Sequence, residues 1–292
     1  MKVTKAVIPA AGFGTRFLPA TKALPKEMFP IIDTPTLQYI VEEAVDSGIT
    51  DILIIIGKNK KCIEDHFDRS VELSDLLERG HKTREIEMVE KIVNMAHIYY
   101  VRQKDMLGSA NAIYEAKAFV GDEPFAVMFG DDLIYNPERP VLSQLINAYE
   151  ETGKTIVGVQ DVPRKEAPKY GIIVPGKEEG RLVEMKGFVE KPPIDELPST
   201  YAALGRYVFN PTIFDKIARL EPHPNGETYI TDAILDAVHD EGVYAYDFEG
   251  RRYDIGDKEG YLEATVEYAL RNEELREPFL KYLRSNKDII GK

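Results

Sequence analysis

The sequence predicts an α/β protein with a mixed, mostly parallel central sheet. Two observations support this: β-branched apolar runs alternate with segments of helical period, and residues 52–56, ILIII, form a continuously apolar run. Such a strand is buried on both faces, as in a parallel sheet covered by helices. The 292 residues suffice for one large α/β domain or two small ones, and the 43% hydrophobic content is ample for a sizeable core.

The N-terminal half follows a regular order of strands and helices. KAVIP at 5–9 is the first predicted strand. The next helix has Thr34 as N-cap, Pro35 in its first position and Gly48 just past its end. The remaining predicted elements are strand 50–57, a long charged helical stretch to about Met95, strand 97–101, helix Ser109 to Phe119, strand 124–130, helix Val141 to Glu151 and strand 154–159.

From Asp161 the pattern changes to hairpin or mixed strands, which we expect to form an insertion over the same sheet. These strands cover 169–176, 180–192 and 200–210. A helix over 230–241 follows, and then a hairpin over 243–256 that turns at Glu249 and Gly250. The tail has apolar residues at helical spacing, namely Leu262, Val266, Ala269, Leu275, Phe279 and Leu283.

Composition argues against several classes of function. The net charge of −13 argues against binding to nucleic acid or to an anionic membrane surface, since both require a basic surface. No apolar run is long enough to span a bilayer, and the N-terminus lacks the layout of a signal peptide, so we expect a cytoplasmic protein. One cysteine cannot form an internal disulfide, and the five histidines lack the close pairing of a zinc site.

The segment PAAGFGTRFLPATKALPKEMFP, residues 9–30, is the first candidate site. Gly12 and Gly14 follow a predicted strand, where glycines let backbone N–H groups turn toward an anion. The segment matches neither the dinucleotide motif nor the ATPase P-loop motif. Its own cations, Arg16 and Lys26, combine a planar fork with a flexible point charge, which suits a polyphosphate.

A second candidate site lies in PFAVMFGDDL, where Asp131 and Asp132 directly follow a buried strand. Open α/β sheets bind ligands at this carboxyl edge. We expect one of the two carboxylates to hold Mg²⁺, which takes one or two carboxylates together with phosphate oxygens and water. The other is expected to cap a helix or turn.

These motifs resemble those of sugar-phosphate nucleotidyltransferases, and specifically of bacterial UTP–glucose-1-phosphate uridylyltransferases. After the glycine loop, VRQKDMLG, FAVMFGDDL, YGII, GFVEKPP, LGRYVF, TDAI and YDFEGRRYDIG follow in family order and cover nearly the whole chain. The resemblance implies a Rossmann-like three-layer α/β/α nucleotidyltransferase fold in a single domain, 1–292. Within it, 1–160 would bind the nucleotide, 161–256 the sugar phosphate, and the helices of 257–292 would be a possible oligomer contact.

The resemblance also implies the roles of individual residues. The loop, with Arg16 and Lys26 as catalytic cations, would wrap the triphosphate of UTP, and Gln103 and Gly108 would read uracil. Asp131 would contact the nucleotide and, with Asp254, hold Mg²⁺. The implied nucleotide-binding residues of the loop are Ala10, Ala11, Gly12, Gly14 and Thr15.

On the sugar side, the resemblance assigns Glu190 to the sugar hydroxyls, Lys191 to the phosphate as a catalytic residue, and Gly171 to the sugar. Neighbouring residues of a strand point to opposite faces, so Glu190 and Lys191 reach one ligand only at a bulge or strand end. The implied reaction joins UTP and glucose 1-phosphate into UDP-glucose and pyrophosphate, without a covalent intermediate. The implied assembly is a homodimer or homotetramer.

Two other functions stay open from the sequence. One is a glucose-1-phosphate thymidylyltransferase that uses dTTP, because one methyl group changes binding by only ~1–3 kcal/mol. The other is an inactive nucleotide-sugar binding or regulatory protein, against which the full set of chemical residues argues. The chain also departs from the uridylyltransferase pattern at Asn111, where a histidine is common, and at Tyr229.

Overall fold

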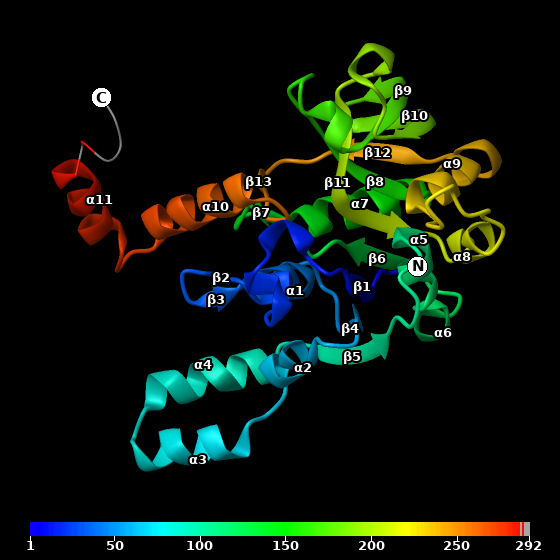
Figure 1. The fold of residues 1–292 in the computed structure, drawn as a ribbon. Coiled ribbons are helices and arrows are strands. Elements are labelled where there is room, and N and C mark those ends of the chain that lie inside the picture. The colour runs from blue at the N-terminus through cyan, green and yellow to red at the C-terminus, as the bar shows by residue number, and fades with distance from the viewer. Residues whose placement is uncertain (287, 289–292) are drawn as a thin grey trace.

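The fold is organised around a nine-stranded sheet, seen in a computed structural model that describes residues 1–286 and 288 (Figure 1). The strand order is β5-β4-β1-β6-β11-β8-β12-β10-β9. The strands are β1 Lys5–Ala10, β4 Asp51–Ile56, β5 His97–Arg102, β6 Phe125–Met128, β8 Ile156–Asp161, β9 Gly171–Glu179, β10 Leu182–Glu190, β11 Tyr201–Phe209 and β12 Tyr244–Asp247.

The sheet is mixed, as predicted, with four parallel and four antiparallel pairs of neighbours along the strand order. β1 pairs in parallel with β4 and β6, β4 with β5, and β8 with β12. β11 runs antiparallel to β6 and β8, and β10 runs antiparallel to β12 and β9. The prediction that the strands after Asp161 form an insertion over the sheet is wrong, because β9, β10 and β11 belong to the sheet itself. β11 is buried along almost its whole length, which suits a central strand covered on both faces.

Helices cover both faces and complete three layers, which confirms the predicted Rossmann-like α/β/α arrangement. One core joins α1 Thr36–Asp46, α2 Lys61–Phe67 and α7 Val141–Thr152 to the sheet. The other joins α5 Ser109–Tyr114, α6 Lys117–Val120, α8 Ile213–Ile217 and α9 Ile230–Asp240.

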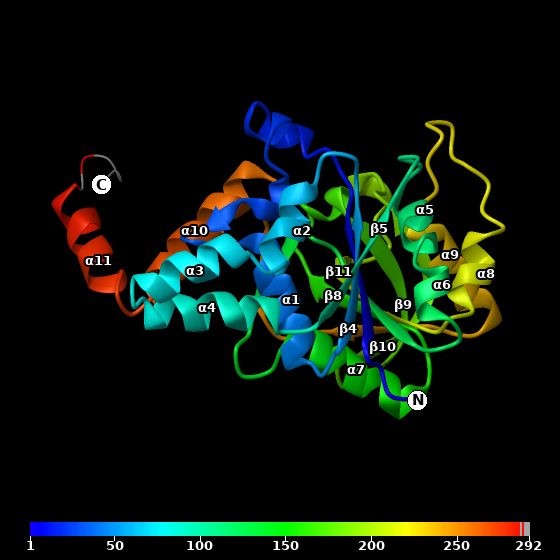
Figure 2. The same ribbon diagram turned by 90° about the horizontal axis from the view of Figure 1, so that it is seen from below.

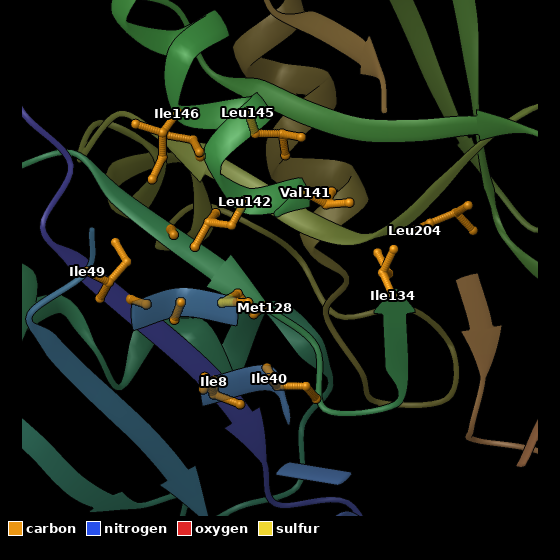
Figure 3. Close-up of a cluster of buried hydrophobic side chains, with 14 of the residues drawn as sticks. Ile8, Ile40, Ile49, Met128, Ile134, Val141, Leu142, Leu145, Ile146 and Leu204 are labelled. Carbon is orange, nitrogen blue, oxygen red and sulfur yellow. The ribbon is translucent and has the colours of Figure 1, made fainter. Parts of the chain in front are cut away.

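The alternation of side chains along β1 divides the two cores. Ile8 lies in the first core and its neighbour Val7 in the second, because successive side chains of a strand point to opposite faces. Figure 3 shows the first core, in which Ile8 of β1 and Ile40 of α1 lie below two leucines of α7, Leu142 and Leu145. The sheet is thus held from both sides, and its strand ends are fixed in place.

Two short sheets lie beside the main one. β2 Pro30–Ile31 pairs with β3 Thr34–Pro35, and β7 Asp132–Tyr135 pairs antiparallel with β13 Arg251–Asp254. The hairpin predicted over 243–256 is therefore wrong, because β12 stays in the main sheet and β13 pairs with β7. Phe248, between them, is buried in the first core, where a tight two-strand turn would leave it exposed.

The start of α1 also differs from the prediction. Thr34 lies in β3 rather than at the N-cap, and α1 begins at Thr36. The Thr36 hydroxyl donates to the Glu27 carbonyl at 2.8 Å, which ties the helix to the segment after the glycine loop. Gly48 does follow the end of the helix, with a left-handed φ of 88°.

Two predicted helices are divided. The long charged stretch forms three helices, α2, α3 Val71–Arg79 and α4 Thr83–Val93. Ser70 starts α3, and its side chain accepts from the Leu73 N–H, so the chain restarts a helix there instead of continuing one. The predicted helix 109–119 is divided into α5 and α6. The short 3₁₀ helices are η1 Thr15–Phe17, η2 Ala20–Lys22, η3 Lys26–Met28, η4 Ala167–Lys169 and η5 Ile194–Glu196.

Two helical arms project from the same side of the molecule, α3 with α4 and α10 Lys258–Arg271 with α11 Arg276–Ser285 (Figure 2). Arg84 of α4 donates to Glu274, which precedes α11, at 3.1 Å. Residues 287 and 289–292 of the predicted C-terminal helical segment lie outside the described residues. In the part of the chain that the structure describes, no helix has both the length and the apolar character needed to cross a bilayer.

Candidate active site

The glycine loop follows β1 and continues into the three short helices η1 to η3. Gly14 has a left-handed φ of 61°, and a Cβ there would lie 3.2 Å from the Lys26 Cβ. The Gly14 carbonyl accepts from the Thr21 hydroxyl at 2.9 Å. The loop is therefore folded back on itself and lies close to Lys26. Of the predicted residues, Ala10 ends β1, and the loop contains Ala11, Gly12, Gly14 and Thr15.

Both predicted cations, Arg16 and Lys26, contact parts of the chain that carry a predicted metal carboxylate. Lys26 Nζ lies 2.7 Å from Asp131 Oδ2, and Arg16 Nη1 donates to the Gly256 carbonyl at 3.3 Å. Burial alone would lower the pKa of Lys26, but the charges of Asp131 and Glu27 outweigh it and raise this pKa above its usual value. Burial opposes ionisation of Asp131 as well, yet Lys26 holds its pKa below the usual range. The pair is therefore ionised.

The two carboxylates come together although 123 positions separate them in the sequence, from Asp131 to Asp254. Asp131 follows β6 and Asp254 ends β13, and the Ile255 N–H donates to the Asp131 carbonyl at 3.0 Å. A Cβ on Gly256 would lie 3.1 Å from Asp254 Oδ1 and 3.2 Å from Asp131 Oδ2. Gly256 thus keeps the space between the carboxylates open.

This donor set fits Mg²⁺, which accepts carboxylate oxygens and completes its shell with phosphate oxygens and water. Among residues 1–286 and 288, no three His, Cys, Asp or Glu side chains form a metal-binding group. Two carboxylates without nitrogen or sulfur ligands match a cation that shares its coordination with a substrate rather than a structural zinc ion.

Asp132 does not cap a helix or turn as expected. It begins β7 opposite Asp254, and its Oδ1 accepts from Arg252 Nε at 2.6 Å and lies 2.5 Å from Nη2 of the same guanidinium. Burial raises the pKa of Asp132 although Arg252 counteracts this. The two adjacent aspartates therefore have different partners, a lysine of the glycine loop and an arginine of β13.

The predicted base-reading residues share a cavity with the glycine loop and its partners. Gln103 directly follows β5, and its side-chain Nε2 donates to Asn111 Oδ1 at 2.9 Å. A Cβ on Gly108, where φ is 96°, would lie 2.3 Å from the Thr228 carbonyl, so only glycine fits. A cavity of about 560 Å³ lies between Gln103, Gly108, the loop residues 11–15, Lys26 and Asp131.

The predicted sugar residues line a second cavity of about 390 Å³, which adjoins the first at Gly108. Glu190 ends β10, and Lys191 takes a left-handed φ of 45°. Because the backbone turns here, both side chains reach the same cavity, and Lys191 Nζ lies 3.3 Å from Glu190 Oε1. A Cβ on Gly171 would lie 2.7 Å from the Phe188 ring, so this position also requires glycine.

Sequence reasoning missed several residues of the site. Tyr170 and Arg252 lie beside Asp254 and sit in the same motifs, KYGII and GRRYDIG, that had pointed to Gly171 and Asp254. Lys60 forms a buried ion pair at 2.7 Å with Glu27, the residue that follows Lys26. Only the order of residues in these motifs could have indicated the first two, and no local pattern marks Lys60.

Comparisons with known proteins place this arrangement in a family. The model of the nucleotidyl transferase family matches residues 5–271. The UTP–glucose-1-phosphate uridylyltransferase of Bacillus subtilis (strain 168) is 52% identical over 99% of both chains. A UTP-bound UDP-glucose pyrophosphorylase from Acinetobacter baumannii has a TM-score of 0.90 at 35% identity, covering 98% of this chain and 100% of that one.

A crystal structure of UDP-glucose pyrophosphorylase complexed with UDP-glucose is also similar, with a TM-score of 0.85 and 40% identity. The match covers 92% of this chain and 100% of the chain in the crystal structure. The likeness in sequence and in structure extends over both cavities, not over the glycine loop alone. The chain therefore belongs to the nucleotidyl transferase family.

Proposed function

We propose that the protein is a UTP–glucose-1-phosphate uridylyltransferase that forms UDP-glucose and pyrophosphate. The observation that carries the proposal is the junction of the two cavities. The base-reading pair, Lys26 and Asp131 line the first cavity, the sugar-side pair lines the second, and Asp254 lies beside Asp131. The relatives named above, at up to 52% identity over nearly the full chain, support the choice of UTP and glucose 1-phosphate.

Binding of UTP uses the first cavity. The base lies between Gln103 and Gly108, because an amide that both donates and accepts can pair with the edge of a pyrimidine. The phosphates follow the backbone of residues 11–15 toward Arg16 and Lys26. Lys26, which pairs with Asp131, would turn to the phosphates, and Asp131 and Asp254 would hold Mg²⁺, which would supply further positive charge.

Glucose 1-phosphate uses the second cavity, with its hydroxyls on Glu190 and its phosphate on Lys191. A phosphate monoester with a second pKa near ~6 is already mostly ionised at neutral pH, so the chain needs no general base. Lys191 orients an ionised phosphate oxygen of glucose 1-phosphate for in-line attack on the α-phosphorus of UTP. Arg16 and Lys26 stabilise the charge that develops on the leaving pyrophosphate, and no covalent enzyme intermediate forms.

The test is pyrophosphate release from glucose 1-phosphate with Mg²⁺ and, in parallel, UTP, dTTP, ATP, CTP or GTP. We expect release to be fastest with UTP. A clear preference for dTTP would make the protein a thymidylyltransferase instead. No release with any nucleotide, from folded protein, would leave only a binding or regulatory role.

The same proposal includes the division of the chain into a nucleotide-binding part, 1–160, a sugar-phosphate-binding part, 161–256, and C-terminal helices, 257–292. It also includes a homo-oligomeric assembly and a cytoplasmic location. Leu262 and Val266 of α10 are exposed, which supports an oligomer contact on the C-terminal helices. Light scattering of the purified protein tests the oligomer, with Leu262→Glu as the variant expected to lower the molar mass. Cell fractionation tests the location.

A further inference from the structure

Tyr170 lies where the two halves of the site meet, between η4 and β9. Its hydroxyl donates to Asp254 Oδ2 at 3.2 Å and accepts from Arg252 Nη1 at 3.0 Å. The direction of these bonds is settled by chemistry: arginine can only donate, so the single hydroxyl hydrogen of Tyr170 is free for the carboxylate.

Arg252 holds the tyrosine ring as well as its hydroxyl. The guanidinium lies over the Tyr170 ring, 4.7 Å from its centroid, and is also fixed by an ion pair with Asp132 that includes one hydrogen bond. Both charged side chains of that pair are only 12–13% exposed. Tyr170 is thus clamped by a buried ion pair rather than by a mobile surface group.

The main chain of Tyr170 contacts the sugar side. Its carbonyl accepts from the Lys191 N–H at 3.1 Å, and this bond holds Lys191 where its φ is left-handed. The next residue, Gly171, pairs in register with Glu190. One residue therefore connects the proposed metal carboxylate to the proposed phosphate-binding lysine.

We propose that Tyr170 is a positioning residue that orients the Asp254 carboxylate for the metal and fixes its distance from Lys191. Asp254 Oδ1 accepts from the Gly256 N–H at 3.1 Å, and Oδ2 accepts from Tyr170 and lies 3.6 Å from Arg252 Nη2. Oδ1 keeps one lone pair for a cation, and the two hydrogen bonds stop the carboxylate from rotating. The inference rests on the proposed function, in which Asp254 holds Mg²⁺.

The test is Tyr170→Phe, which removes the hydroxyl and keeps the ring. Mn²⁺ binding to protein saturated with UDP-glucose, followed by electron paramagnetic resonance, is the readout. We expect the dissociation constant of Mn²⁺ to rise about tenfold, as for other groups that orient metal ligands. We also expect kcat to fall about tenfold, with a much smaller change in the KM for UTP, whose proposed contacts are untouched.

Tyr149→Phe is the matched control. Its hydroxyl, on α7 and away from both cavities, donates to Asn210 Oδ1 at 2.7 Å, so this variant also loses one internal hydrogen bond. It should lower the melting temperature to a similar degree and leave Mn²⁺ binding and kcat unchanged. Equal behaviour of the two variants would reduce Tyr170 to a structural residue and overturn the inference.

Asp254→Asn separates this inference from the proposed function. We expect Asp254→Asn to weaken Mn²⁺ binding and to abolish the effect of a second Tyr170→Phe substitution, because Tyr170 acts through that carboxylate. Weak Mn²⁺ binding in Asp254→Asn together with normal binding in Tyr170→Phe would overturn the Tyr170 inference alone. Normal binding in Asp254→Asn would overturn the metal assignment and the inference with it.

Discussion

Asp131 and Asp132 are neighbours in the chain, yet they form ion pairs of opposite character. The Asp131–Lys26 pair is partly open, with side chains 38% and 18% exposed, and it joins a flexible lysine to one carboxylate oxygen. The side chains of the Asp132–Arg252 pair are 12–13% exposed, and two nitrogens of the planar guanidinium lie within 2.6 Å of one carboxylate oxygen. The first pair can separate when a ligand brings new charges, whereas the second holds β7 and β13 together.

The difference follows from the strand to which each aspartate belongs. Asp131 precedes β7 and lines the first cavity, whereas Asp132 is the first residue of β7, is paired with Asp254 in register and lines the second cavity. Asp132 is tied to the fold through the planar guanidinium of Arg252, whereas Asp131 is tied only through a flexible lysine. In the proposed function, one of these neighbouring residues holds the metal and the other stabilises the fold.

The largest effect is expected from breaking the buried pair. Arg252→Met leaves the Asp132 carboxylate buried without its partner, so the free energy of unfolding should fall by about 3–5 kcal/mol, as measured by urea unfolding. The control is Arg251→Met at the preceding residue, whose partners Glu263 and Glu267 are 48% and 32% exposed, and it should cost less than about 1 kcal/mol. Equal losses would mean that burial does not distinguish the two arginines.

Breaking the open pair should affect turnover rather than folding. Lys26→Met removes the charge that we propose stabilises the leaving pyrophosphate, so kcat should fall by about 100–1,000-fold. The free energy of unfolding should change by less than about 1 kcal/mol because the pair is partly exposed. Lys22→Met, an exposed lysine of the same segment, is the control and should keep its activity. A stability loss as large as that of Arg252→Met would remove the contrast between the pairs.

A pH series should sharpen the contrast with a smaller effect. Burial already raises the pKa of Asp132, and Arg252 is the main group that opposes this, so Arg252→Met should raise that pKa further. A carboxyl whose folded pKa lies above its unfolded value stabilises the fold below the unfolded pKa and loses this stability as the pH rises through the folded value. The deficit of Arg252→Met should therefore grow as the pH rises above the usual pKa range of a carboxyl group, by at most about 1.4 kcal/mol per pH unit. A deficit that shrinks over this range would contradict the account.

Much of the architecture could be predicted because it depends on local patterns. The apolar run at 52–56 and the alternation of strands and helices led directly to the central sheet and its three layers. The predicted hairpin at 243–256 was wrong because the preference of Phe248 for the core outweighs a local turn signal at Gly250. Thr34 could not be recognised as a strand residue, since β3 exists only through its pairing with β2.

The candidate site was predictable in its parts but not in its assembly. Gly108, Gly171 and the turn at Lys191 occupy positions where backbone geometry or space restricts the residue, and the motifs contain them. The approach of Asp131 to Asp254 depends on the pairing of β7 with β13, which no local pattern encodes. The clamp of Tyr170 by Arg252 depends on the same long-range pairing, so only the structure could reveal it.

The most direct test of the central claim is single-turnover pyrophosphate release from UTP and glucose 1-phosphate with Mg²⁺, comparing the unmodified protein with Asp131→Asn. We predict release by the unmodified protein and a rate about 100–1,000-fold lower for the variant, with an unchanged melting temperature, because Asp131 would hold the metal at the phosphates. Equal rates for the two proteins would contradict the assignment of the metal, and with it the separate roles of the two aspartates.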